Sequence, residues 1–129
     1  MSIIKSAYAH CDVPCGIYET DTATHAAATC LKMTQKYKEL HDDAERENQM
    51  VRIVMYKEEH AARCKEQLYM LWSDYFKPQH LETFPDLHDK FWLATKQCGA
   101  VKQSLAEDTA QKLVNMVAEI ADMFAQTKK

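Results

Sequence analysis

Apolar residues recur at every third or fourth position along most of this chain. This spacing places them on one face of an α-helix and so predicts amphipathic helices. The predicted helices cover about 21–41, 50–77, 85–104 and 108–124. The links between them are short, and a connector at 79–84 separates the first helical pair from the second. The pattern therefore predicts an all-α fold, an antiparallel four-helix bundle.

Polar residues, prolines and a glycine mark the expected helix ends. Thr20-Asp21-Thr22 offers N-cap side chains to the first helix, and His41-Asp42-Asp43 is a polar break after it. The remaining boundary signals are Pro78 after the second helix, Pro85 in the first turn of the third, Gly99 near its end, and Ser104 or Asp108 as the cap of the fourth. Cys30, Cys64 and Cys98 fall on the apolar stripes, so they are expected in the core, as is Trp72.

Composition narrows the class of protein. The 129 residues suit one domain, and only two glycines and three prolines interrupt a helix-favouring composition. A formal net charge of −3 argues against nonspecific nucleic-acid binding. Five cysteines, an odd number, do not indicate a secreted disulfide framework, so a cytoplasmic location is predicted. Residues 1–9 lack the apolar run of a secretory signal and are too short to span a membrane.

The most informative stretch is His10-Cys11-Asp12-Val13-Pro14-Cys15-Gly16-Ile17-Tyr18. Cys11 and Cys15 are three residues apart, and the intervening proline and following glycine allow a short loop that aims both sulfurs at one point. Two thiolates suggest a metal site, but zinc sites usually need a second ligand pair at a defined spacing. No such pair follows in the sequence.

His10 directly before Cys11 changes the interpretation. Cleavage between Ala9 and His10 would expose an α-amine beside the His10 imidazole, the Cys11 backbone nitrogen and two thiolates. A tetragonal set of nitrogen and sulfur donors suits Ni(II) or Cu(II) better than Zn(II). Nickel is favoured, because the bound amide nitrogen must lose its proton, which only a strongly Lewis-acidic d⁸ or d⁹ ion in a planar field readily achieves.

The pattern His-Cys-Asp-x-Pro-Cys-Gly-x-Tyr resembles the nickel hook of the nickel-dependent superoxide dismutases. A second block, Leu71-Trp72-Ser73-Asp74-Tyr75-Phe76-Lys77-Pro78, followed by His80 and by Phe84-Pro85-Asp86-Leu87-His88, resembles the other signature of that family. The resemblance covers residues 10–129 and implies an oxidoreductase that converts two superoxide anions and two protons to O2 and H2O2 by Ni(III)/Ni(II) cycling. It also implies one nickel ion per chain, a leader of residues 1–9 removed by a peptidase, and a homohexamer.

The resemblance assigns roles to residues of this chain. It implies that Cys11 and Cys15 are thiolate ligands, that Cys11 also gives its backbone nitrogen, and that His10 gives its amine and imidazole. Tyr18 and Tyr75 match tyrosines that line the approach to the metal and hold ordered water. Asp12 and Lys77 match charged residues near the hook, and Lys77 is the best candidate for attracting an anion. The match at Pro14 implies a cis peptide bond.

Two positions depart from the family pattern. Members often place a glutamate and an arginine around the axial histidine, whereas ungapped alignment puts Ala26 and His60 there. One hypothesis is that His60 replaces the missing hydrogen-bond donor to His10. His80 and His88, which flank the connector, are expected to form local hydrogen bonds.

Two other classes of function stay open from the residues. A non-catalytic nickel carrier or sensor would use the same hook without redox cycling, and a helical assembly protein would use Cys11 and Cys15 as a thiol switch. Neither explains why His10 precedes Cys11 or why the block at 71–78 is present.

Overall fold

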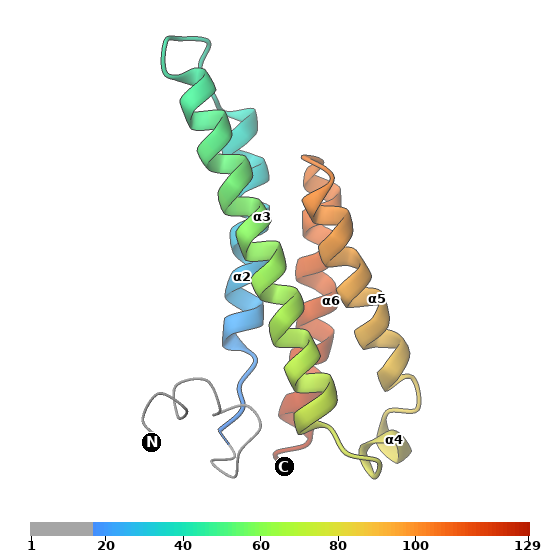
Figure 1. Cartoon of the computed structure of the whole chain (residues 1–129). Helices are drawn as coiled ribbons and strands as arrows, with labels where there is room; N and C mark the ends of the chain where they lie inside the picture. Colours follow the sequence, from blue (N-terminus) through green and yellow to red (C-terminus); the bar gives the residue numbers. More distant parts are fainter. Residues whose placement is uncertain (1–16) are drawn as a thin grey trace, which may run out of the picture.

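The computed structural model of the chain describes residues 17–129, so the predictions for the leader and for His10 to Gly16 lie outside the described residues. Within this part the chain is helical and contains no strand (Figure 1). The elements are α2 (Asp21–Lys38), α3 (Arg46–Met70), the π-helical turn η1 (Leu71–Tyr75), α4 (His80–Thr83), α5 (Leu87–Lys102) and α6 (Glu107–Gln126).

The four long helices run alternately up and down and form a ring of neighbours. Helix α2 packs against α3 and α6, and α5 packs against the same two helices from the other side. Figure 1 shows the link between α2 and α3 extending beyond the link between α5 and α6. The predicted all-α antiparallel four-helix bundle is confirmed. None of the helices in residues 17–129 is both long and apolar enough to cross a membrane.

The core lies between the four helices and consists mainly of small and aliphatic side chains. Cys30, Cys64 and Cys98 come from three different helices and are fully buried free thiols, as predicted. The apolar positions predicted for the last helix also face inward, with Leu113 fully buried and Phe124 packed at the edge of the core. One cation, Lys57, is buried with them and is 2% exposed.

The helix ends differ from the predictions in local detail. Helix α2 begins at Asp21, but none of the predicted caps bonds its N-terminus by its side chain. Instead, the Glu19 carboxylate accepts the Thr22 backbone N–H at 2.7 Å and the Thr22 hydroxyl at 2.9 Å. Ser104 accepts the N–H of Ala106, which precedes the first residue of α6. Glu19 thereby satisfies a backbone N–H that the first turn of α2 leaves unpaired, whereas Ser104 binds the residue that precedes α6.

The prediction that Trp72 lies in the core is wrong. Its side chain is 42% exposed, and its indole N–H donates to Nδ1 of His88 at 2.9 Å. Leu68 and Leu71 already fill the inward positions of this helical face, and Trp72 follows Leu71 by one residue, which turns it out of the core. The indole N–H requires a partner, and the exposed position provides one. The hydrogen bond predicted for His88 as local instead joins α5 to η1, 16 residues earlier in the chain.

Candidate functional site

A π-helical turn at the end of α3 places the residues of the second motif. The backbone N–H of Phe76 donates to the Leu71 carbonyl at 3.1 Å, which widens the last turn by one residue. The Ser73 hydroxyl donates to the Tyr69 carbonyl at 2.8 Å. It thus competes with the backbone N–H groups that would bond this carbonyl in a regular α-helix. The chain then becomes extended at Phe76, two residues before Pro78. This exit directs Phe76 into the core and Tyr75 towards the end of the bundle.

Tyr75 is the centre of an aromatic cluster at this end. Its ring centroid is 5.5 Å from that of Tyr18, 4.6 Å from that of Phe124 and 5.1 Å from that of Phe76. The His80 ring stacks on it at 6.1 Å with an interplanar angle of 13°. These distances are within the range of favourable aromatic contacts. The structure thus brings together Tyr18 and Tyr75, which are predicted site residues 57 positions apart in the sequence.

The hydroxyl of Tyr75 is held by the segment that follows α6. Thr127 Oγ1 lies 2.5 Å from the Tyr75 hydroxyl and donates its own proton to the Phe124 carbonyl at 2.6 Å. A threonine hydroxyl has a single proton, so Tyr75 is the donor to Thr127. Sequence analysis did not identify Thr127, because no local motif marks a contact between residues 75 and 127.

Two lysines are connected to this cluster, Lys77 through its backbone and Lys128 through its ammonium. Lys77 is exposed, and its backbone N–H donates to Nδ1 of His80 at 3.0 Å, the local hydrogen bond expected of His80. Lys128 places its ammonium nitrogen 5.1 Å from the ring centroids of both Tyr75 and Phe124, within cation–π range. Among residues 17–129 neither lysine forms an ion pair, so no neighbouring carboxylate neutralises these charges.

The described part of the bundle offers no cluster of metal-binding side chains. Residues 17–129 contain no group of three or more His, Cys, Asp or Glu side chains that could hold a metal ion. Two of the three core thiols are held in the protonated form, which does not bind metal: burial raises the pKa of Cys30 to about 12, and a hydrogen bond with Cys98 raises the pKa of Cys64. The other donors predicted from the sequence are His10, Cys11 and Cys15, which lie outside the described residues, as does Asp12.

Comparison with known proteins decides which family the chain represents. Residues 5–128 match the family model of nickel-containing superoxide dismutase. The nickel superoxide dismutase of Streptomyces seoulensis is 39% identical over 121 residues, which cover 94% of this chain and 89% of that protein. The corresponding protein of Streptomyces coelicolor is 37% identical over the same length. This chain belongs to the nickel-containing superoxide dismutase family.

The fold agrees with this membership. The native structure of a nickel superoxide dismutase superposes with a TM-score of 0.85 at 36% identity and covers 93% of this chain and 100% of that one. A partially reduced nickel-containing structure gives a TM-score of 0.84 at 37% identity. The predicted family, the oxidoreductase class and the nickel cofactor are therefore confirmed. The roles predicted for individual site residues stay predictions.

The two positions that depart from the family pattern are both buried. Ala26 packs in the core from α2. His60, on α3, directs its Nδ1 to the Tyr56 carbonyl at 2.8 Å, so this nitrogen carries the proton of the neutral ring. Its Nε2 then accepts from Arg63 at 3.3 Å. A neutral His60 in this arrangement has no N–H left for His10, so supporting His10 would require a second proton or a broken bond to Tyr56.

Proposed function

We propose that this nickel superoxide dismutase converts superoxide to O2 and H2O2 at a nickel ion held by an N-terminal hook of His10, Cys11 and Cys15. The observation that supports this proposal most directly is the contact between Tyr18 and Tyr75 at the end of the bundle. Tyr18 follows Cys15 by three residues, and three residues span at most about 11 Å. A hook that ends at Cys15 would therefore lie within reach of Tyr75 and Lys77, which the sequence places in the second family motif.

The residues proposed for the hook fit a nickel ion that changes oxidation state. Two thiolates, a backbone nitrogen, an amine and an imidazole form the mixed nitrogen and sulfur set that a tetragonal metal prefers. Bound nickel would supply the one-electron chemistry, taking an electron from one superoxide and returning it to a second. The absence of a competing metal cluster within residues 17–129 supports the assignment of the metal to the hook.

The other predicted residues would control access and charge. Tyr18 and Tyr75 are half-buried and in contact, so they would narrow the approach to the metal and hold ordered water there. Lys77 is exposed and free of ion pairs among the described residues, so it would attract the superoxide anion. Asp12 would add a charged group within the hook. The protons that convert reduced superoxide to H2O2 would reach the site through water.

The proposal includes removal of residues 1–9, because the His10 amine is free only after cleavage. We expect nickel-loaded protein that begins at His10 to catalyse superoxide decay in pulse radiolysis, and full-length protein to be inactive under the same conditions. A Cys15→Ser variant of the trimmed protein should lose both nickel and activity. One bound nickel per trimmed chain without turnover would contradict catalysis and would favour a nickel carrier.

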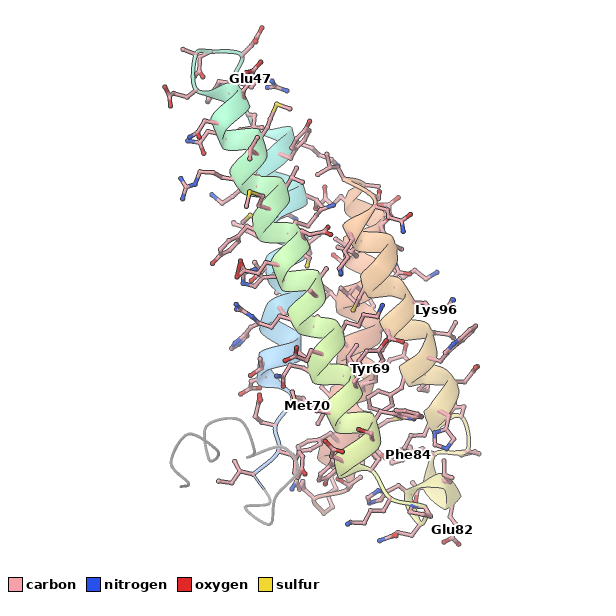
Figure 2. The ribbon with its side chains drawn as sticks, in the orientation of Figure 1. Glu47, Tyr69, Met70, Glu82, Phe84 and Lys96 are labelled. Carbon is pink, nitrogen blue, oxygen red and sulfur yellow. The ribbon has the colours of Figure 1, made fainter. Side chains whose placement is uncertain are left out.

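The proposed enzyme is a cytoplasmic homohexamer. Two exposed apolar patches support self-association: Val51, Met55 and Tyr56 on α3, and a second patch where α3 faces α5. The second patch comprises Tyr69, Trp72 and Trp92, which line one hollow together, and Figure 2 shows Tyr69 on this side of α3. A closed hexamer with dihedral symmetry needs more than one type of interface, which two patches can provide. The free thiols at Cys30, Cys64 and Cys98 suit a reducing compartment.

Sedimentation velocity tests the assembly. The full-length chain and the trimmed chain should both sediment as hexamers, and Trp92→Lys should shift the distribution to smaller species because it places a charge in the second patch. Gln111→Lys, which places the same charge on an exposed part of α6, serves as the control. A Trp92→Lys protein that remains hexameric would remove this patch from the interface.

A further inference from the structure

The segment that follows α6 lies on Tyr75, although the two are more than fifty residues apart in the sequence. Backbone hydrogen bonds fix this segment: the Thr127 N–H donates to the Met123 carbonyl at 3.2 Å and the Lys128 N–H to the Ala125 carbonyl at 3.1 Å. The side chains of Thr127 and Lys128 then contact opposite parts of the same tyrosine, one at its hydroxyl and one over its ring. None of the roles predicted from the sequence involves these two residues.

We propose that Thr127 and Lys128 complete the superoxide approach, with Thr127 positioning the Tyr75 hydroxyl and Lys128 adding, over the Tyr75 ring, a positive charge to that of Lys77. The inference rests on the proposed function, because it takes Tyr75 and Lys77 to line that approach. It extends that function by naming a positioning residue and an anion-attracting residue from a different part of the chain.

The hydrogen-bond direction defines what Thr127 does. Thr127 uses its only proton on the Phe124 carbonyl, so it accepts the proton of Tyr75. The Tyr75 proton therefore points towards α6, and its oxygen lone pairs are left for donors such as water. Tyr75 in this state cannot donate to an anion, so its contribution is to orient water and to hold its ring against Tyr18.

The position of Lys128 defines its charge effect. Its ammonium is 5.1 Å from the centroids of the Tyr75 and Phe124 rings and has no carboxylate partner among residues 17–129. The contact with the two ring faces holds a flexible side chain close to Tyr75. The whole molecule has a formal charge of −3 and repels superoxide, so local cations determine how readily the anion enters. Removing one such charge should lower the rate constant about two- to threefold at low salt.

The charge is tested with Lys128→Gln and Lys128→Arg in nickel-loaded protein that begins at His10. We expect Lys128→Gln to lower the second-order rate constant in pulse radiolysis about two- to threefold at low ionic strength and to approach the unmodified enzyme at high salt. Lys128→Arg should retain the rate. Lys112→Gln changes net charge equally on an exposed part of α6 and is the matched control. Equal effects of Lys128→Gln and Lys112→Gln, or a loss that salt does not diminish, would overturn the role of Lys128.

The positioning role is tested without nickel. In metal-free trimmed protein labelled with ¹³C at the tyrosine Cζ, Thr127→Val should shift the Tyr75 signal, and Thr127→Ser should restore it. Thr29→Val removes another hydroxyl that donates to a backbone carbonyl, on α2, and should leave the Tyr75 signal unchanged. An unshifted Tyr75 signal in Thr127→Val would overturn the positioning role. An inactive unmodified enzyme would overturn the proposed function and this inference together, whereas an active enzyme indifferent to both substitutions would overturn this inference alone.

Discussion

Lys57 is a buried lysine whose replacement tests how the end of α5 is stabilised. Its side chain crosses the core from α3 and is 2% exposed. The ammonium donates to the carbonyls of Val101 at 2.6 Å, Lys102 at 3.2 Å and Ser104 at 2.5 Å. Val101 and Lys102 are the last residues of α5 and Ser104 lies just beyond it, where few backbone donors remain for carbonyl groups. Lys57 therefore acts as a cap supplied by a neighbouring helix, and Lys57→Met removes the cap while keeping most of the stem.

The expected loss of stability follows from two opposing effects. Hydrogen bonds from a charged group contribute about 1.5–3 kcal/mol each, and buried carbonyls left without donors cost about 1–3 kcal/mol. Burying an ammonium is itself unfavourable, which lowers the pKa of Lys57 and offsets part of this contribution. We therefore expect Lys57→Met to reduce the free energy of unfolding by about 2–3 kcal/mol, and the melting temperature by roughly 6–15 °C for a domain of this size.

The assay is thermal and urea unfolding of the metal-free chain at one fixed protein concentration, because assembly makes stability depend on concentration. Lys112→Met, an exposed substitution on α6, should remain within about 0.5 kcal/mol of the unmodified chain. Because the folded pKa of Lys57 lies below its ordinary value of 10.5, the unfolded chain binds more protons between the two values. Between these two pH values the free energy of unfolding therefore rises with pH, and the Lys57→Met protein lacks this rise. A Lys57→Met protein as stable as the control would refute the capping argument.

Two further predictions concern charge and thiols. Hydrogen bonds from Gln35 and then Lys38 lower the pKa of Glu107, so Glu107 stabilises the fold above pH 4.5 and this contribution disappears as the pH falls through the lowered value. Glu107→Gln should lower the melting temperature at pH 7, with a difference that narrows in acid; a constant difference would contradict this. The three core thiols are fully buried, and burial raises the pKa of Cys30 to about 12, so with both hook cysteines replaced by serine all three should react with a disulfide reagent only after urea unfolding. A thiol that reacts in the folded chain would contradict the assigned burial.

The long helices could be predicted from the sequence because burial along each of them follows the helical period. Leu113, Val117 and Ile120 recur at positions that face one side of a helix, and all three are buried. The third helix passes through Gly99 and ends at Lys102, inside the range where the glycine was expected to weaken it. Packing between neighbouring helices stabilises this end more than the low helix propensity of one glycine weakens it.

Short irregular elements could not be predicted, because tertiary contacts determine them. The connector at 79–84 contains the single-turn helix α4, and the second helix ends in a π-helical turn rather than a regular α-helical one. The turn depends on the Ser73 hydroxyl at the Tyr69 carbonyl and on the burial of Phe76 against Phe91, with ring centroids 5.4 Å apart. The hydrophobic periodicity over 71–76 carries no information about either contact. The prediction that Trp72 lies in the core was wrong for the same reason.

The topology of the bundle, more than any sequence motif, predicts which segments lie next to the candidate site. In an antiparallel four-helix bundle, the start of the first helix, the end of the second and the end of the fourth share one end of the molecule. The predicted bundle therefore already implies that Tyr18, Tyr75 and the residues after α6 lie close together, and the ring and hydroxyl contacts of Tyr75 show that they do. Figure 1 shows the start of α2, the end of α3 and the C-terminus at the same end of the bundle. Topology cannot specify that Thr127 accepts the Tyr75 proton or that Lys128 lies over the ring, because those contacts depend on the π-helical turn. A substitution that restores a regular α-helical end to α3 should therefore disturb Tyr75 while leaving the bundle intact.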